Sequence, residues 1–275
     1  MIEIIRLHPA ALPRLAVFDF DGTLSLVRSG WQQIMGDLMV ETLLQARCNE
    51  APPQLRRIVD HFIVGSTGQP TVEQMAWLAA EVERCGGAAE SPAEYKRRFE
   101  MRLQERIEGR LGELRHGARA PDTLLVPGAR ALLDGLRRRE VPLALISGTD
   151  RDAVVQEAGA LRIAGYFGDR IYGPGPHDPG FSKPTMMARL LSECELPGAA
   201  LVGFGDGPVE TAATRAAGGL AVGVALDEAH GSRLDPHKRT ALIAAGADII
   251  VPHFGVYARL VEIIFDTKKA LEIRD

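Results

Sequence analysis

Short apolar runs without polar alternation recur along this sequence, and they constrain the fold more than any other feature. Strands that are buried on both faces of a parallel sheet have this character, because neither face meets water. The runs lie at 15–20, 141–146, 199–204 and 220–226, with a weaker one at 247–251. Between and after them lie segments with helical spacing, at 129–139, 152–158, 184–193, 209–217, 236–245 and 256–265. This alternation predicts an α/β fold built on a doubly wound parallel sheet.

The stretch between the first two predicted strands, about 26–125, has a different character. Apolar residues recur there at helical spacing, from Trp31 to Leu43 and from Leu55 to Ile63, and no convincing strand is present. Glycine, proline and aspartate collect where the stretch leaves and rejoins the α/β pattern. The sequence therefore predicts an α/β core formed by residues 1–25 and 118–275, and an inserted all-helical part at 26–117.

The charge and hydropathy patterns argue against nucleic-acid and membrane partners. The formal net charge is -4, and lysine and arginine form no long basic block. No run approaches the roughly 18 apolar residues of a membrane span. The N-terminus has no extended apolar core before its first charges, so it does not resemble a signal peptide. We therefore expect no nucleic-acid or membrane partner and a cytoplasmic location.

The three cysteines, Cys48, Cys85 and Cys194, are far apart in the sequence and form no C-x-x-C pair. Reduced thiols are the default for a chain that is expected to be cytoplasmic. The sequence therefore predicts no disulfide framework.

A pair of acids, Asp19 and Asp21, stands at the end of the first strand and is followed by Gly22. Side chains two apart on a strand share a face, so both carboxylates can point into one site. Two nearby like charges raise each other's pKa unless a cation lies between them. The pair therefore predicts a bound metal or a carboxyl group that donates a proton, with an Asx turn at Gly22 as the structural alternative.

Three further positions suit a phosphate ester and a metal. The second strand ends in Ser147-Gly148-Thr149, where a hydroxyl and main-chain N–H groups near a helix suit a phosphoryl oxygen. Lys183 stands before a helix, and its ammonium can neutralise a phosphate. Gly205-Asp206-Gly207 follows another strand, with Glu210 in the next helix, and these acids indicate a Mg²⁺ site. Taken singly, these residues could instead be a loop, a solvated lysine and a helix cap.

The order and positions of these groups carry more weight than any one of them. In open parallel sheets, sites form outside the carboxyl ends of the strands. The acid pair, the hydroxyl, the lysine and the second group of acids lie at or near successive strand ends. Together they supply a nucleophile, a phosphate clamp and a metal site.

These motifs resemble the haloacid dehalogenase superfamily, specifically its phosphatase branch. The first motif is Asp19-Phe20-Asp21-Gly22-Thr23, the second Ser147-Gly148-Thr149 and the third Lys183. The fourth is Gly205-Asp206-Gly207 with Glu210, where the family often has a second Asp. The helical insertion looks like the cap of the phosphoglycolate phosphatase and β-phosphoglucomutase type. The resemblance implies a Rossmann-like core with an inserted helical cap domain.

The resemblance also implies the roles of the two acids of the first motif. Asp19 would attack phosphorus and form an aspartyl-phosphate, which is nucleophilic catalysis. Asp21 would protonate the leaving alcohol and then deprotonate the water that hydrolyses the intermediate. An alkoxide leaving group needs a proton whereas a halide does not, so Asp21 argues for phosphate esters.

The same resemblance implies a Mg²⁺ ion held by Asp19, by the main-chain carbonyl of Asp21 and by Asp206. Glu210 would hold a metal-bound water. The residues implied to bind the phosphoryl oxygens are Ser147, Gly148 and Lys183.

The most irregular part of the helical insertion, 65–70, lies between two of its predicted helices. We hypothesise that Thr67 in this segment faces the site and contacts the leaving group, together with Arg28 from the entry to the insertion. A simple interhelical turn is the alternative.

Three classes of function fit these residues. The favoured one is the Mg²⁺-dependent hydrolysis of the phosphate monoester of a small metabolite, such as a sugar phosphate or phosphoglycolate. A phosphomutase would use the same residues and return the phosphoryl group to a reoriented substrate. A catalytically silent binding protein need not retain every motif acid and Lys183, so their presence argues against it. Both a monomer and a homodimer are compatible with the sequence.

Overall fold

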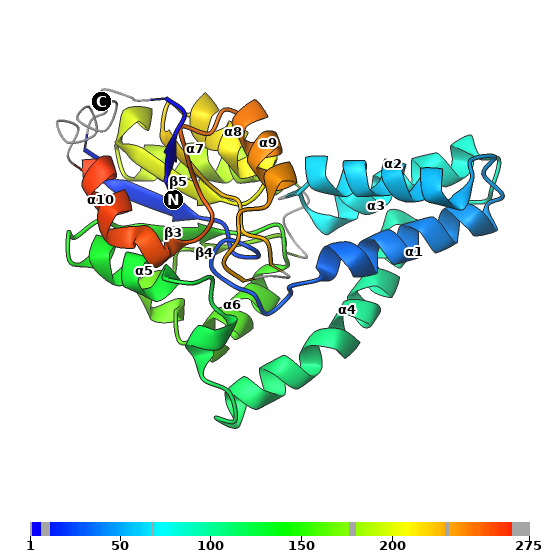
Figure 1. The fold of residues 1–275 in the computed structure, drawn as a ribbon, viewed down its shortest axis with the longest axis horizontal. Coiled ribbons are helices and arrows are strands. Elements are labelled where there is room, and N and C mark those ends of the chain that lie inside the picture. The colour runs from blue at the N-terminus through cyan, green and yellow to red at the C-terminus, as the bar shows by residue number, and fades with distance from the viewer. Residues whose placement is uncertain (1, 7–11, 68, 176–179, 229–230, 266–275) are drawn as a thin grey trace.

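A seven-stranded sheet, in the order β1-β7-β6-β5-β2-β3-β4, forms the centre of the computed structural model (Figure 1). The structure describes residues 2–6, 12–67, 69–175, 180–228 and 231–265. All neighbouring strands are parallel except β1 and β7, which pair antiparallel at one edge. The prediction of an α/β fold with a doubly wound parallel sheet is confirmed. The strands are β1 (Glu3–Ile4), β2 (Leu15–Phe18), β3 (Leu143–Ile146), β4 (Ile171–Tyr172), β5 (Leu201–Gly205), β6 (Leu220–Val224) and β7 (Ile249–Val251).

Helices cover both faces of this sheet, because its strands are apolar on both sides. In β2, Leu15 and Val17 belong to one apolar cluster, and Ala16 and Phe18 belong to another on the opposite face. Helices α7 (Lys183–Glu193), α8 (Pro208–Ala216) and α9 (Pro236–Ala244) cover the face of Leu15 and Val17. The opposite face is covered by α5 (Ala129–Arg137), α6 (Arg151–Ala160) and α10 (Tyr257–Phe265).

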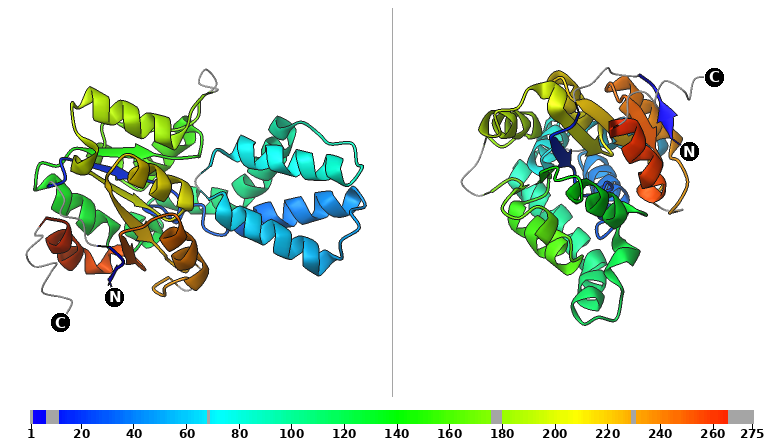
Figure 2. Two further views of the ribbon diagram at one scale, coloured as in Figure 1. Left: turned by 90° about the horizontal axis from the view of Figure 1, so that it is seen from above. Right: turned by 90° about the vertical axis from the view of Figure 1, so that its left-hand side faces the viewer.

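The first four α-helices after β2 form a bundle beside the α/β part (Figure 2, left). The apolar residues at helical spacing pack inward: Met35, Leu38 and Met39 have no exposed surface. Phe62 stacks on Trp77 of a neighbouring helix, with ring centroids 3.9 Å apart. The division of the chain at 25/26 and 117/118 stays a prediction. The helices are α1 (Trp31–Gln45), α2 (Pro52–Gly65), α3 (Thr71–Arg84) and α4 (Pro92–Arg115).

Each of the five predicted runs contains a strand, and the differences lie at the ends and in the shortest elements. β2 ends at Phe18, because the main chain turns at Phe20, whose carbonyl oxygen accepts from the N–H of Leu24. The two-residue strands β1 and β4 were not predicted, since so short a segment carries no periodic signal. In the described part of the chain, no helix combines the length and apolar character needed to cross a membrane.

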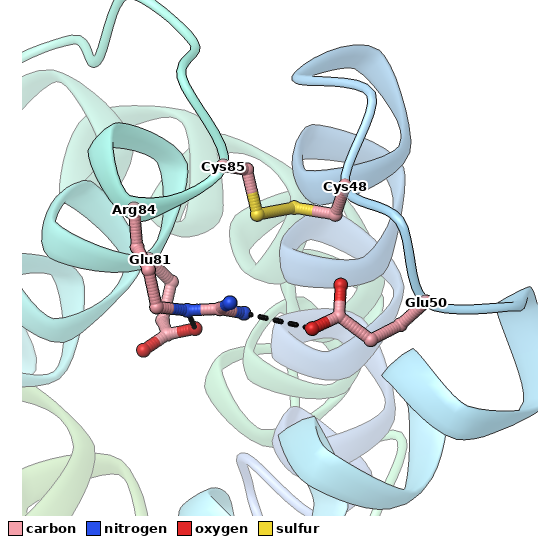
Figure 3. The surroundings of a disulfide bond; sticks show 5 residues. All are labelled: Cys48, Glu50, Glu81, Arg84 and Cys85. Atoms are coloured by element: carbon pink, nitrogen blue, oxygen red, sulfur yellow. Dashed lines mark hydrogen bonds and ion pairs between the residues drawn. A yellow bond between two sulfur atoms is a disulfide. The ribbon is translucent and has the colours of Figure 1, made fainter.

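The prediction about the cysteines is wrong for two of the three. Cys48 and Cys85 form a disulfide, with their Cα atoms 4.9 Å apart (Figure 3). The two residues are separated by 37 positions in the sequence, but the turn after α1 and the turn after α3 meet at one end of the bundle. Sequence spacing alone does not show this, because the thiols come together only when the helices pack into the bundle. Cys194 is a free thiol.

Candidate active site

The motif acids meet at the carboxyl ends of β2 and β5, which are neighbours in the sheet. The N–H of Asp19 donates to the carbonyl oxygen of Phe204, at 2.9 Å, so the two strand ends are joined directly. The chain then turns at Gly22, where φ is +78°. A Cβ atom at Gly22 would lie 2.2 Å from Oδ2 of Asp206. Glycine is therefore required here for the turn and for the close approach of the two motifs.

Lys183 joins the first motif to the fourth. Its buried ammonium lies 2.5 Å from Oδ1 of Asp19 and 3.0 Å from Oε2 of Glu210. Burial alone would lower the pKa of Lys183, but the charges of Asp19 and Glu210 raise it above its ordinary value. The lysine therefore stays positively charged between two carboxylates. Its hydrogen-bond partners are these two acids.

Asp19, Asp206 and Glu210 form a buried cluster whose nearest ligand atoms lie within 4.8 Å of one another. Burial raises the pKa of Asp19 well above its ordinary range, although Lys183 opposes the shift. Burial also raises the pKa of Asp206 to about 6. Both pKa shifts reflect the unfavourable free energy of placing ionised carboxylates close together and away from water.

This cluster fits a Mg²⁺ ion. Oδ1 of Asp206 is buried and has no hydrogen-bond partner among the described residues, which is costly unless a cation or water meets it. Magnesium takes oxygen ligands and usually only one or two carboxylates. Both oxygens of Glu210 already accept hydrogen bonds, from Lys183 and from the N–H of Gly207. Asp19 and Asp206 are therefore better placed than Glu210 to contact a metal directly.

Asp21 lies in a different environment from Asp19. The hydroxyl of Thr149 donates to Oδ2 of Asp21 at 2.8 Å, and Nε of Arg28 lies 3.9 Å from Oδ1. Burial nevertheless raises the pKa of Asp21, and Arg28 and Thr149 offset only part of this shift. The surroundings therefore make the Asp21 carboxyl group a weaker acid than a carboxyl group in water.

The acids face a cavity of about 60 Å³, which also contains Ser147, Gly148 and Thr149 from the second motif. The Ser147 hydroxyl is buried and accepts from the N–H of Thr149 at 3.0 Å, so the loop after β3 is held in place. Lys183 contacts Asp19, which lines this cavity, and Glu210 contacts Lys183. The structure thus brings all the predicted core residues into one place.

The two predicted residues of the helical part also line the cavity. Arg28 lies on the segment that leads into α1, and its guanidinium donates to Glu157 at 2.5 and 2.9 Å. Thr67 donates to the carbonyl oxygen of Ile63 at 3.0 Å. A Cβ atom at Gly207 would lie 2.5 Å from the carbonyl oxygen of Thr67, so this loop packs closely on the fourth motif. Gly68, from the same predicted segment, lies outside the described residues.

Sequence reasoning missed three charged residues of the site. Glu157 on α6 pairs with Arg28, and burial raises the pKa of Glu157 to about 7. Lys238, near the start of α9, lies 2.7 Å from Oδ2 of Asp206 and 2.8 Å from Oε1 of Glu228. The search at strand ends could have found Glu228, because it follows the strand at 220–226. Glu157 and Lys238 lie inside helices and carry no motif signal.

A sequence model of the haloacid dehalogenase-like hydrolase family matches residues 13–218. The chain belongs to this family. The match includes all four motifs and the helical insertion, so the resemblance identified from the motifs is confirmed. This haloacid dehalogenase-like chain is accordingly an enzyme of the hydrolase class. A comparison with curated protein sequences gave no significant match.

Solved structures of haloacid dehalogenase-like proteins share the fold. β-Phosphoglucomutase from Clostridium difficile matches with a TM-score of 0.61 and 12% identity, over 94% of this chain and 100% of that one. A predicted phosphoglycolate phosphatase from Haemophilus somnus matches with a TM-score of 0.58 and 15% identity, over 90% and 97%. A hydrolase from Deinococcus radiodurans, solved with bound phosphate and sodium, matches with a TM-score of 0.54 and 19% identity, over 92% and 96%. At such identities, the likeness establishes the fold alone.

Proposed function

We propose that this chain is a Mg²⁺-dependent phosphatase that hydrolyses the phosphate monoester of a small metabolite through an aspartyl-phosphate on Asp19. The observation that carries the proposal is the meeting of two motif acids with different hydrogen-bond donors at one cavity. Asp19 accepts a hydrogen bond from the ammonium of Lys183, whereas Asp21 accepts one from the neutral hydroxyl of Thr149. Two carboxyl groups whose environments differ in this way suit a nucleophile and a general acid.

In this proposal, Asp19 attacks phosphorus with the carboxylate oxygen that faces the cavity. Lys183 donates to Oδ1 of Asp19, and the hydroxyl of Thr23 lies 3.3 Å from Oδ2, so the carboxylate is held in one orientation. A fixed nucleophile lowers the entropic part of the barrier. Ser147, the N–H of Gly148 and Lys183 bind the phosphoryl oxygens and balance their charge in the transition state.

Asp21 transfers the protons. Its carboxyl proton goes to the oxygen of the leaving alcohol as the phosphorus–oxygen bond breaks, and Asp19 retains the phosphoryl group. The resulting carboxylate then removes a proton from the water that attacks the aspartyl-phosphate. Thr149 holds the other carboxyl oxygen of Asp21 at 2.8 Å and keeps the group pointing at the cavity.

The Mg²⁺ ion would be held by Asp19, the main-chain carbonyl of Asp21 and Asp206. Glu210 would hold a metal-bound water. When bound, the ion supplies positive charge to the phosphoryl oxygens and to the clustered acids. The unpartnered Oδ1 of Asp206 supports this assignment.

We further propose how the helical part and the substrate take part. The helical part at 26–117 acts as a cap over the core, and Thr67 and Arg28 contact the leaving group. The substrate is a small phosphorylated metabolite, and the chain is a monomer or a homodimer. The disulfide weighs against the cytoplasmic location, because disulfides are rare in reducing compartments.

The test is phosphate release from a panel of phosphorylated metabolites, with and without Mg²⁺, by the wild type and by Asp19→Asn. We expect Mg²⁺-dependent release that Asp19→Asn abolishes. Full activity of Asp19→Asn would refute the nucleophile. A bisphosphate product in place of free phosphate would identify a phosphomutase, and no turnover of any kind would favour the binding-protein alternative.

A further inference from the structure

The cavity beside Asp19 has an apolar wall on the side of the helical bundle. Trp31 and Met35 come from α1, and Phe99 and Leu103 come from α4. Met35 has no exposed surface, and Phe99 and Leu103 expose less than a twentieth of theirs. A leaving group that enters this cavity therefore loses water on one side and gains only apolar contacts there.

The charged residues of the cavity also restrict which leaving groups can bind. Of the described residues that line it, Arg28 is the sole cation. The Arg28 guanidinium already donates twice to Glu157, and it lies 3.9 Å from Asp21. One positive charge thus stands between two acidic groups. A carboxylate on the leaving group would be buried here without a cation of its own, which is strongly unfavourable.

We propose that the leaving group is an uncharged alcohol with one apolar face, and that esters whose leaving group bears a carboxylate or a second phosphate are rejected. Thr67, Gln69 and Thr71, which also line the cavity, can hydrogen-bond the hydroxyl groups of such an alcohol without adding charge. This inference rests on the proposed phosphatase function. Of the two substrate types considered above, it selects the sugar or polyol phosphate over phosphoglycolate.

The test compares two esters of the same chain length, 2-phosphoglycolate and 2-hydroxyethyl phosphate, which differ in a carboxylate and a hydroxymethyl group. We expect kcat/KM to favour the neutral ester by at least roughly 100-fold, because an unpaired buried polar group gives discrimination of this size or more. Trp31→Arg should reduce the preference by about tenfold or more through a new cation, and the neutral control Trp31→Gln should not.

Equal or better turnover of 2-phosphoglycolate by the wild type would overturn the inference and leave the phosphatase assignment intact. An unchanged preference in a folded Trp31→Arg would also count against it. If neither these esters nor the wider metabolite panel released phosphate, the proposed function itself would fail.

A separate feature lies on the other side of Asp206, where Lys238 is held between two carboxylates. Its ammonium contacts Oδ2 of Asp206 and Oε1 of Glu228, and only 12% of the lysine side chain is exposed. Oδ1 of the same Asp206 has no hydrogen-bond partner in the part of the chain that the structure describes. Oδ2 of Asp206 is thus paired with the fixed ammonium of Lys238, and Oδ1 can contact a metal ion.

We infer that Lys238 is a built-in counter-ion of the metal site, which limits its affinity for Mg²⁺ and positions Asp206. The lysine offsets part of the negative charge of the clustered acids when no metal is bound. The same charge opposes a divalent cation at Asp206, because like charges repel strongly where water is excluded. Glu228 weakens this repulsion, because its negative charge also lies in contact with the ammonium of Lys238.

Opposite effects of two substitutions test this inference. Lys238→Met should tighten Mg²⁺ binding by on the order of tenfold, and Glu228→Gln should weaken it by a similar factor, since each changes the local charge by one unit. The double variant should return near the wild-type affinity. Titration calorimetry with Mg²⁺ alone measures the affinity without turnover, and Lys96→Met, which removes a lysine paired with Asp150 and Glu100, is the control.

Weaker Mg²⁺ binding in both single variants would overturn the counter-ion role. A general loss of structure weakens binding in either variant, whereas the counter-ion role requires opposite changes. Absence of Mg²⁺ binding in the wild type would overturn it too. A second readout is the melting temperature: added Mg²⁺ should raise it more in Lys238→Met than in the wild type, as tighter binding to the folded state requires.

Discussion

Removing the disulfide between Cys48 and Cys85 should destabilise the protein by a large part of its total stability. The bond joins residues separated by 37 positions, and the chain-entropy relation for a loop of this length gives about 4 kcal/mol. A typical domain has only about 5–15 kcal/mol in all. The ion pairs of Arg84 with Glu50 and Glu81 lie beside the disulfide (Figure 3) but are half-exposed, so they add little.

The assay is urea unfolding of the wild type and of the double variant Cys48→Ser/Cys85→Ser, each with and without a reductant. The reductant should lower the unfolding free energy of the wild type to that of the variant and leave the variant unchanged. Cys194→Ser is the matched control, because Cys194 is a free thiol, and it should keep the response to the reductant.

A thiol titration of the unreduced, denatured wild type decides the premise independently. The chain has 3 cysteines, so one disulfide leaves a single reactive thiol. Three reactive thiols would refute the bond and restore the expectation of reduced cysteines. One thiol together with an unfolding free energy that the double substitution leaves unchanged would refute the entropic reasoning instead.

Three further substitutions have expected outcomes. Lys183→Met should lower kcat for phosphate release by at least roughly 100-fold, because it removes the cation at the proposed nucleophile Asp19, and circular dichroism checks that the variant folds. Burial raises the pKa of Glu157 from 4.5 to about 7, so the native state keeps a proton that the unfolded chain releases. The stability of the wild type relative to Glu157→Gln should therefore fall as pH rises from about 4.5 to about 7 and level off above, in urea unfolding at several pH values. Gly205→Ala should destabilise by about 1–3 kcal/mol in the same assay, since its Cβ would lie 2.0 Å from Cγ of Glu210.

The parts of the site that sequence reasoning predicted are those fixed by the sheet. A buried parallel strand leaves an apolar run in the sequence, and its carboxyl end lies at a known edge. Asp19, Ser147 and Asp206 stand at or just after the ends of such runs, and the structure brings them to one cavity. The fold class followed from the same runs, because strand and helix patterns alternate along the chain.

The parts that could not be predicted depend on how helices pack. Cys48 and Cys85 end up together because two turns meet at one end of the bundle, and nothing in their spacing records this. Glu157 and Lys238 each stand on a helix among other charged residues, and a solvated helical face has the same composition. Their importance comes from Arg28 and Asp206, which they meet only in the folded chain.

Lys183 was predicted to bind phosphate, yet in the structure it contacts Asp19 and Glu210, and the two roles are compatible on grounds of charge. Burial raises the pKa of Asp19, and a protonated carboxyl group is a poor nucleophile, so a cation in contact is needed to keep the carboxylate ionised. In the proposed mechanism, the Asp19 carboxylate loses its charge when it bonds to phosphorus, and the same ammonium would then face the phosphoryl oxygens. A single buried lysine can therefore activate the nucleophile first and balance the phosphoryl charge afterwards. On this reasoning, Lys183→Arg should retain little activity, because a planar guanidinium cannot fill the compact position between Asp19 and Glu210 that an ammonium occupies.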